Sequence, residues 1–465
     1  MKRSPGLSVT IDRKAGPPVF EQICAAIRAR AMAGALPEGT WLPPTRALAT
    51  ELGVSRSTVI TAYEQLVAEG YLEGRRGAGH VIRALGGVDL AARPEPAAAR
   101  NPDQPPPPRP FAAGQPDMRL FPYRQWARTV SRLCRTAPHS MLAGGPVFGD
   151  PDLRREIAAH VAQWRGVETS PHQIVVTAGA TDALELCMRA LGAPGDLVGL
   201  ETPGYLPLRH FVQSHGLIPS YLEVDENGAT LPRHASPRFV ILTPSHQFPL
   251  GGAMSPDRRM AFIRWANAQG SWILEDDYDS EFRYAGRPIP AMAGFDRLSR
   301  TLYIGSFSKI FSSSLRLGYV ILPEALLDRF ARTMAQTGIR ASTMPQPALA
   351  AFMASGEFYR HLRRVRRIHD ERRRFLLDSL TRDFADYGHF TDHQAGMQVV
   401  LHLDPRFRDT ELARRAAQKG LAVQPLSGFC AEGVPGNGLV LGFCGVTPAE
   451  MAPALTVLRE CFAPC

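Results

Sequence analysis

The chain has 465 residues, of which 45% are hydrophobic and 21% are charged. This composition is that of an ordinary globular protein and excludes wholesale disorder, while the length predicts two or three domains. The formal net charge is +9, which makes an acidic partner such as nucleic acid plausible. Only four of the 53 cationic residues are lysines, at positions 2, 14, 309 and 419. A lysine inside a structured segment of this arginine-rich chain therefore needs a reason.

Several classes of protein are disfavoured by the sequence. No apolar run approaches the roughly 18 residues needed to span a bilayer, and the first residues lack the apolar core of a signal peptide. The seven cysteines are scattered without a C-x-x-C pair, so neither a zinc site nor a disulfide framework is indicated. We therefore expect a cytoplasmic protein with reduced thiols, no metal site and no membrane partner.

The first 83 residues begin with two predicted helices. Apolar residues recur at helical spacing over 20–31, directly after two prolines, and predict a first helix with one buried face. A second, short helix is expected between Thr45 as its N-cap and Gly53 just past its end.

A third helix and a hairpin complete this unit. Ser55 is expected to cap the third helix, whose inward side chains are predicted to be Val59, Tyr63, Leu66 and Val67. Two helices joined by a short glycine-containing turn are typical of a helix-turn-helix. Residues 71–82 alternate around a glycine-rich, doubly basic tip, as a two-stranded wing does.

Residues 18–82 resemble the winged helix-turn-helix of the GntR family of bacterial transcription regulators over essentially its whole length. Recognition helices present their N-terminal residues to the major groove, where hydroxyls bind phosphates and arginine reads guanine. Each polar residue alone is more often solvated surface, but the ordered set favours DNA contact. The candidate DNA-binding residues are Arg46, Ser55, Arg56, Ser57, Thr58, Arg75 and Arg76.

Residues 84–110 separate two stretches of different composition. The segment 93–110 is almost wholly proline, alanine and polar residues, lacks apolar periodicity, and is expected to be an extended linker. The basic excess is densest before it, because residues 1–83 carry 11 Lys/Arg against 7 Asp/Glu.

From residue 111 onward, apolar runs alternate with helical patterns. Continuous apolar strands separated by helices predict an α/β domain with a mainly parallel sheet that is buried on both faces. Ligands of such sheets bind at the carboxyl ends of the strands. The predicted strands are residues 173–177, 197–201, 239–243, 271–277, 301–306 and 317–322.

Residues suited to one cofactor follow these strands. Lys309 comes after the fifth strand and can form a Schiff base when its amine is desolvated, while Asp276 ends the fourth strand and suits a pyridinium nitrogen. Capping of a helix is the alternative role for residues 276 and 277. Further candidates are Tyr205 as a stacking aromatic, Ser306 and Arg316 for a phosphate, and the helix-opening amides of Gly179, Ala180 and Thr181.

This set resembles the fold-type-I aminotransferase family over residues 111–465. The resemblance implies pyridoxal 5'-phosphate on Lys309 as an internal aldimine, Asp276 at the ring nitrogen, Tyr278 at the phenolic oxygen and Tyr205 over the ring. The predicted fold class is therefore multidomain: a mainly α winged helix-turn-helix joined to an α/β aminotransferase-like domain. The expected boundaries are residues 1–83, a linker at 84–110, a large domain at 111–350 and a basic helix with a small domain at 351–465.

The whole architecture is similar to the MocR subfamily of GntR regulators. The resemblance implies a homodimer that binds paired operator half-sites on double-stranded DNA. Its effector would be the cofactor itself or an amino compound that reacts at Lys309. A working aminotransferase with an accessory DNA-binding domain is the alternative function, and a DNA-binding protein with an inert scaffold is a weaker one.

Three departures from the aminotransferase pattern favour the regulator. The turn at 246–251 lacks the usual asparagine, so His246 or Gln247 would have to replace it. The strand expected at 438–446 has no arginine to grip a substrate carboxylate, and glycines stand at 142–150 where aminotransferases often place a tyrosine that reaches the neighbouring subunit. We therefore expect at most partial transamination.

The sequence also contains a run of positively charged residues toward its C-terminal part. Residues 360–374 carry eight arginines on a predicted long helix. A solvated face partly neutralised by Asp370 and Glu371 is the favoured interpretation. The alternative is an auxiliary track along DNA phosphates, which would steepen the salt dependence of binding.

Overall fold

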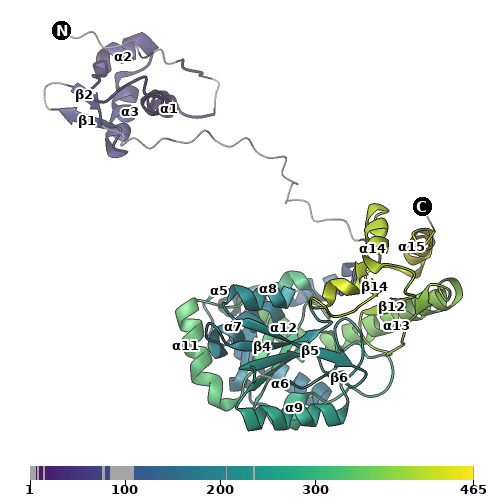
Figure 1. Ribbon diagram of the computed structural model, residues 1–465. Coiled ribbons are helices and arrows are strands. Elements are labelled where there is room, and N and C mark those ends of the chain that lie inside the picture. The colour runs from purple at the N-terminus through teal and green to yellow at the C-terminus, as the bar shows by residue number, and fades with distance from the viewer. Residues whose placement is uncertain are drawn as a thin grey trace. The chain divides into compact units, whose positions relative to one another are not determined.

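The computed structural model describes residues 7, 10–13, 16–75, 79–83, 109–205, 207–233 and 236–463. The chain divides into two compact units, Met1–Pro105 and Pro106–Cys465, and each is described by itself (Figure 1). Nearly all of the predicted linker lies outside the described residues. The predicted division of the second unit near residue 350 stays a prediction.

The first unit contains three helices and a hairpin in the predicted order. Their apolar faces meet in one core, in which Ile27, Leu48 and Leu66 are completely buried. The two strands pair antiparallel, with Leu72 opposite Ile82. The elements are α1 (Val19–Met32), α2 (Thr45–Leu52), α3 (Arg56–Ala68), β1 (Leu72–Arg75) and β2 (Gly79–Ile82).

The end of α2 is as predicted, but its start is not. Gly53 terminates the helix in a left-handed conformation with φ of 62°, which glycine adopts without steric cost. Thr45 is the first helical residue rather than the N-cap, because Pro44 occupies that position and brings no side-chain hydrogen bond.

The cap of α3 is also as predicted. The Ser55 side chain accepts a hydrogen bond from the Thr58 amide at 3.1 Å and satisfies a donor that the first helical turn leaves free. The prediction that Val67 faces inward is wrong, because its side chain is 39% exposed. Leu66 holds the core position, and the next residue lies about 100° further around the helix.

The second unit is built on an eight-stranded sheet of order β3-β10-β9-β8-β7-β4-β5-β6. Strands β5, β4, β7, β8 and β9 run parallel, whereas β10 is antiparallel to both β9 and β3. The strands are β3 (Ile174–Thr177), β4 (Leu197–Thr202), β5 (Ile218–Asp225), β6 (Gly228–Ala229), β7 (Phe239–Leu242), β8 (Trp272–Asp277), β9 (Thr301–Ser306) and β10 (Gly318–Ile321).

Each of the six predicted apolar runs contains a strand, and the observed ends of each strand differ from the predicted ones by at most one residue. The sequence analysis missed β5, which lies toward one edge of the sheet. Its side chains are mostly exposed or half-buried, so the strand lacks the continuous apolar run that marks a strand covered on both faces.

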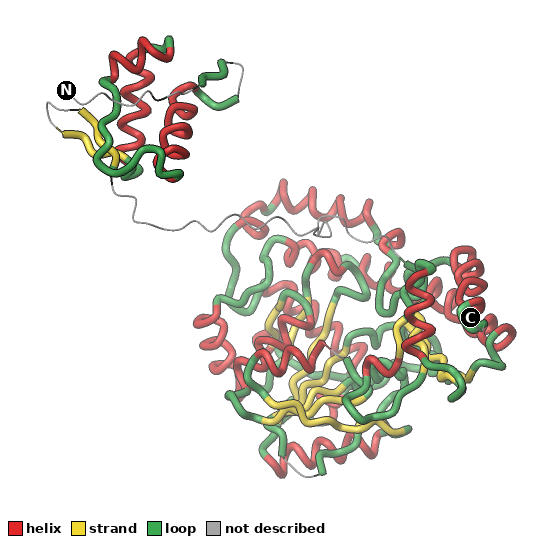
Figure 2. The backbone as a smooth tube through the Cα atoms, turned by 45° about the horizontal axis from the view of Figure 1, so that its top comes forward, coloured by secondary structure: helices red, strands yellow, loops and turns green. Residues whose placement is uncertain are grey.

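Helices cover both sides of this sheet, as Figure 2 shows with strands in yellow and helices in red. The α-helices of this part of the chain range in length from 4 to 15 residues. They are α4 (Tyr123–Thr136), α5 (Pro138–Leu142), α6 (Pro151–Arg165), α7 (Ala180–Leu191), α8 (Pro207–Ser214), α9 (Pro256–Gln269), α10 (Met292–Phe295), α11 (Leu327–Thr337) and α12 (Pro345–Ala354).

The last third of the chain adds a second, antiparallel sheet of order β11-β12-β14-β13. Its elements are α13 (Glu357–Asp383), β11 (Gly388–His389), β12 (Gln398–Leu403), α14 (Asp409–Gln418), β13 (Gln424–Pro425), β14 (Gly438–Gly442) and α15 (Pro448–Glu460). None of the described helices combines the length and the apolar character needed to cross a membrane.

The arginine-rich run lies on α13, but it is not a uniformly solvated face. Arg372 is buried and its guanidinium lies 2.8 Å from a carboxylate oxygen of Asp117. Arg373 is buried as well and pairs with Asp370 and Asp392. The solvated interpretation is therefore wrong for these two residues, whose partners include side chains from distant parts of the chain.

Candidate functional site

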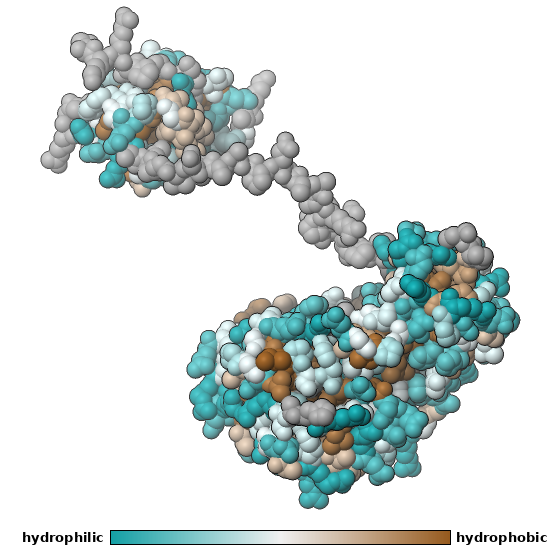
Figure 3. Space-filling model, in the orientation of Figure 1, coloured by the Kyte–Doolittle hydropathy of each residue, from teal (hydrophilic) through white to brown (hydrophobic). Residues whose placement is uncertain are grey.

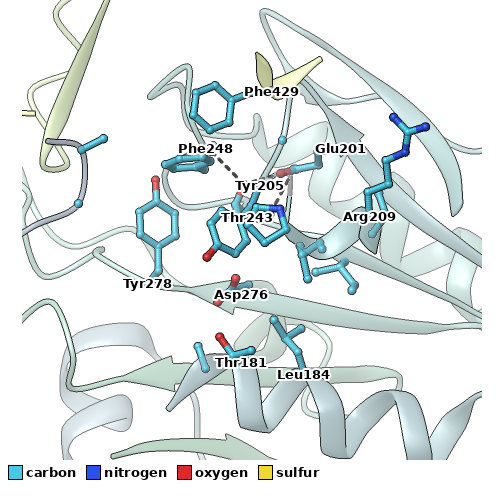
Figure 4. A pocket seen from close by; sticks show the side chains of 18 of the residues that line it. Thr181, Leu184, Glu201, Tyr205, Arg209, Thr243, Phe248, Asp276, Tyr278 and Phe429 are labelled. Atoms are coloured by element: carbon cyan, nitrogen blue, oxygen red, sulfur yellow. Dashed lines mark hydrogen bonds between the residues drawn. The ribbon is translucent and has the colours of Figure 1, made fainter. Parts of the chain in front are cut away.

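A cavity of about 710 Å³ lies at the carboxyl ends of β4, β7, β8 and β9. Figure 4 shows Asp276, Tyr278 and Tyr205 gathered around one space there. The structure brings together every residue that the sequence analysis selected for a cofactor. These cavity-lining residues are Gly179, Ala180, Thr181, Tyr205, Asp276, Tyr278, Ser306, Lys309 and Arg316.

Asp276 presents an unpartnered carboxylate oxygen to this cavity. Its Oδ1 atom is buried and makes no hydrogen bond with any described residue. Burial, with added repulsion from Asp277, Glu201 and Asp279, raises the pKa of Asp276 to about 7. A buried acceptor without a donor costs free energy, so a hydrogen-bond donor that carries positive charge would be stabilising here.

The neighbouring carboxylate has a structural role. Successive side chains of a strand point to opposite faces, and Asp277 meets Arg165 at 2.7 Å and the Tyr303 hydroxyl at 2.6 Å. Helix capping is wrong for both acids, because they are the last two residues of β8.

Lys309 follows β9 and lines the same cavity. Its Nζ atom donates a hydrogen bond of 2.6 Å to the carbonyl oxygen of Gly114. Burial lowers the pKa of the amine, and the Asp279 carboxylate opposes this shift only in part. A lowered pKa increases the fraction of neutral amine, which is the nucleophilic form.

The amino end of α7 forms a concave surface at one end of the cavity. Gly179 caps the helix with φ of 106°, and a Cβ atom on Gly318 would lie 2.8 Å from its carbonyl carbon. Ser306 accepts a hydrogen bond from the Ser308 amide at 3.2 Å. Arg316 holds a left-handed φ of 50°, a strained conformation for arginine, and it lines the cavity as well.

Two tyrosines also line the cavity. Tyr205 is 47% exposed, and its ring centroid lies 5.8 Å from that of Phe248. The Tyr278 hydroxyl lies 2.9 Å from Nδ1 of His246, and burial together with Asp279 raises the pKa of this tyrosine well above its ordinary value.

The structure does not place His246 or Gln247 in the cavity as direct substitutes for the missing asparagine. His246 lies behind Tyr278 and also meets Asp279 at 3.0 Å. Gln247 donates to the carbonyl oxygens of Pro203 and Phe248. His246 is therefore placed to orient Tyr278 rather than to touch a ligand.

The lining also includes polar residues that were not predicted from the sequence, among them Gln398, Glu201 and Arg209. Gln398 is 3% exposed and lies near Tyr278, yet neither of its amide atoms completes a hydrogen bond with a described residue. Burial raises the pKa of Glu201 to about 7 against two hydrogen bonds from Thr243. The position of Glu201 at the end of β4 was an available signal, whereas nothing in the sequence marks the other two.

In the first unit, four of the predicted DNA-binding residues lie at the start of α3. Ser55, Arg56 and Ser57 are exposed there, while Thr58 is half-buried. The Ser55 hydroxyl lies 2.8 Å from that of Ser57 and 2.7 Å from that of Thr58. These three hydroxyls are thus within hydrogen-bonding distance of one another at the start of α3.

The remaining predicted DNA contacts lie on α2 and the hairpin. Arg46 is exposed on the first turn of α2. Arg75 ends β1, lies 3.8 Å from Glu73 and places its guanidinium 5.9 Å from the centre of the Trp41 ring. Arg76 lies outside the described residues.

Comparisons with known proteins match both units. The family model "Bacterial regulatory proteins, gntR family" matches residues 20–82, and "Aminotransferase class I and II" matches residues 110–458. The chain is 37% identical to the probable rhizopine catabolism regulatory protein MocR of Rhizobium meliloti, over 98% of this chain and 96% of that protein. It is 35% identical to the HTH-type pyridoxine biosynthesis transcriptional regulator PdxR of Corynebacterium glutamicum, over 91% of each.

A solved structure with a bound ligand is also similar. It is the α-aminoadipate aminotransferase LysN of Thermus thermophilus, complexed with N-(5'-phosphopyridoxyl)-L-leucine. The identity is 27%, the TM-score is 0.68, and the match covers 76% of this chain and 91% of that one. The chain therefore belongs to the MocR-type HTH transcriptional regulators, in which a GntR DNA-binding domain is fused to an aminotransferase class I and II domain.

Proposed function

We propose that this transcriptional regulator holds pyridoxal 5'-phosphate on Lys309 and responds to the cofactor or to an amino compound in the same cavity. The observation that carries the proposal is the buried, unpartnered oxygen of Asp276 in a cavity shared with Lys309. A protonated pyridine nitrogen is the donor that such a carboxylate lacks, and a desolvated lysine amine suits an aldehyde.

The other lining residues fit the remaining groups of this cofactor. The free amides of α7 and the guanidinium of Arg316 suit a phosphate, since a helix amino terminus and an arginine fork both favour anions. Tyr278 would donate to the phenolic oxygen, and Tyr205 would cover the ring. When bound, the cofactor supplies an electrophilic aldehyde carbon to which an amine can be joined covalently.

The first experiment tests the cofactor and its attachment point. Purified protein incubated with pyridoxal phosphate and then reduced with borohydride is expected to carry one pyridoxyl group on the peptide containing Lys309. The K309R variant should lose the label, because its guanidinium is not nucleophilic. The matched control K419R removes an exposed lysine that pairs with Glu460 and should keep the label. An unlabelled wild-type protein would refute the cofactor.

DNA reading is proposed to rest on the seven residues around α3, α2 and the hairpin. A homodimer would present two such surfaces to paired half-sites. Arg56 is the candidate for base recognition, so R56A should weaken operator binding by about 1–3 kcal/mol and relax the base preference at one position. R46A should weaken binding to all sequences alike, since a phosphate contact carries no sequence information. Equal affinity of R56A and wild-type protein for the operator would exclude this role.

Effector sensing requires that the ligand favour one of two regulator states. A spectral titration of the cofactor-loaded protein with candidate amines identifies compounds that react in the cavity. Operator affinity is then measured with and without each reacting compound. If every reacting amine leaves operator affinity unchanged, the cavity has no sensing role.

The similarity to an α-aminoadipate aminotransferase keeps catalysis as a second candidate function. A complete catalyst regenerates the aldehyde form with a keto acid and turns over many times, whereas a sensor stalls after at most half a reaction. The strand β14 has no arginine that could grip a substrate carboxylate. Multiple turnovers with any pair of amino and keto acids would favour the enzyme over the sensor.

A further inference from the structure

A second, smaller cavity of about 190 Å³ lies between α13 and the segment that follows β8. We name it the arginine pocket, because its lining consists of Tyr284, Asp370 and four arginines: Arg283, Arg363, Arg366 and Arg367. It shares no lining residue with the proposed cofactor cavity. Figure 3 shows a hydrophilic surface over α13.

The arginine pocket carries an excess of positive charge. None of its four arginines forms an ion pair with a residue that the structure describes. Its one carboxylate, Asp370, is already shared, because one oxygen accepts from Arg373 and the other from Arg374. The nearby Glu281 is buried and lies 3.2 Å from His160. The four cationic side chains therefore outnumber the single carboxylate of the lining, and that carboxylate is already hydrogen-bonded to two other arginines.

Arg366 is held in place by the fold, whereas Arg283 has a side-chain donor without a partner in the part of the chain that the structure describes. Arg366 donates to the carbonyl oxygen of Arg283, and its guanidinium lies 5.7 Å from the centre of the Trp164 ring. The Nε atom of Arg283 is buried and finds no acceptor among the described residues. A buried donor without an acceptor is costly, and an anion in the pocket would satisfy it.

We propose that the arginine pocket binds a phosphate-type oxyanion. Guanidinium groups match the geometry of phosphate with paired hydrogen bonds, which a lysine cannot provide. The pocket volume of about 190 Å³ suits a single anionic group rather than a whole cofactor. Arg283 and Arg366 are half-buried, and the exposed Arg363 and Arg367 complete the site from the surface of α13.

The phosphate can come from two sources, a free oxyanion or the backbone of bound DNA. Both offer the same chemistry to the four guanidinium groups, and they differ in what else changes when the pocket is removed. A DNA phosphate contributes to operator affinity and to its dependence on salt. A free oxyanion binds the protein without DNA and leaves the operator affinity unchanged.

The test compares full-length wild-type protein with two double variants. R363Q/R367Q removes two exposed pocket arginines, and the matched control R264Q/R332Q removes two exposed arginines of α9 and α11 that lie outside the pocket. Inorganic phosphate is titrated into each protein by calorimetry in a buffer without other multivalent anions. The amino end of α7 is unchanged in all three proteins, so any phosphate bound there cancels in the comparison.

We expect R363Q/R367Q to bind phosphate at least tenfold more weakly than wild-type protein and the control to bind it normally. The charge-conserving R363K/R367K should recover only part of the affinity, because an ammonium lacks the planar fork. Equal phosphate binding by wild-type protein and R363Q/R367Q, or no phosphate binding by wild-type protein, overturns the proposal.

Operator binding at several salt concentrations then identifies the source. If the pocket holds a DNA phosphate, R363Q/R367Q lowers operator affinity, and the slope of log affinity against log salt falls by about one for each phosphate that the variant no longer neutralises. If it holds a free oxyanion, the operator affinity of R363Q/R367Q equals that of the control. This test does not depend on the cofactor, so it stands or falls separately from the role of Lys309.

Discussion

Replacement of Asp276 by asparagine tests the physical basis of the cofactor cavity. The substitution keeps the shape of the side chain and removes its charge. In the cofactor-free protein, burial and three neighbouring acids raise the pKa of this carboxyl from 3.8 to about 7. The folded state therefore binds a proton that the unfolded chain has already released, and stability falls as pH rises from about 4 to about 7.

The size of this loss of stability follows from the shift in the pKa of Asp276. About three pH units at 1.36 kcal/mol each amount to about 4 kcal/mol of stability that is present at low pH and absent above pH 7. Glu201 titrates in the same range and is coupled to Asp276, so removal of one acid also eases ionisation of the other. Between pH 5 and pH 8, which covers about two of these three units, we expect D276N to lose about 2–3 kcal/mol less stability than wild-type protein.

The assay is urea unfolding of cofactor-free protein at pH 5 and pH 8, followed by tryptophan fluorescence. Four of the five tryptophans lie in the second unit, so the signal reports on the fold that contains the cavity. Carboxyls with lowered pKa values, such as Glu411 and Glu450 at about 2, titrate below this window. The control D328N removes an exposed carboxylate on α11. If D276N and wild-type protein lose the same stability over this range, the reasoning about Asp276 is wrong.

Three further predictions concern packing, pairing and capping. G318A inserts a methyl group against the backbone at the start of α7 and should weaken binding of pyridoxal phosphate at least tenfold in an absorbance titration. An unchanged affinity would contradict the close packing at this glycine. R165A leaves the Asp277 carboxylate buried without its partner and should lower the free energy of unfolding in urea by about 3–5 kcal/mol. A loss below about 1 kcal/mol would show that the pair is not desolvated. S55A removes the cap of α3 and should lower the stability of the first unit by about 1 kcal/mol, as measured by circular dichroism during unfolding. S57A should lower it by less, and equal losses of stability would argue against the cap.

The sequence predicted well which residues gather at the carboxyl ends of the strands, because one topological rule connects them. Parallel strands end at the same edge of a sheet, so residues as distant as Gly179 and Arg316 meet once the strands are recognised. The apolar runs were long and continuous enough to reveal those strands. Segments that reach this edge from elsewhere in the fold, such as those of Gly114 and Gln398, leave no comparable signal in the sequence, because their positions depend on tertiary packing.

The direction in which side chains point was the second feature that the sequence could not predict. The sequence identified His246 as a polar residue near the expected ring oxygen, but it could not reveal that the imidazole turns toward Asp279 behind Tyr278. Likewise, a run of eight arginines resembles a solvated face, because the buried partner of Arg372 lies 255 residues away in the sequence. Long-range pairing of charges leaves no local pattern.

The hydrogen bond from Lys309 to Gly114 has a consequence for the chain that enters the second unit. Gly114 lies five residues after Arg109, the first described residue of that unit, and its carbonyl oxygen accepts a hydrogen bond from the free lysine amine. A reaction that converts this amine to an imine would leave its nitrogen with at most one N–H donor in place of three. The lysine amine thus joins the segment that enters the second unit directly to the lining of the cavity.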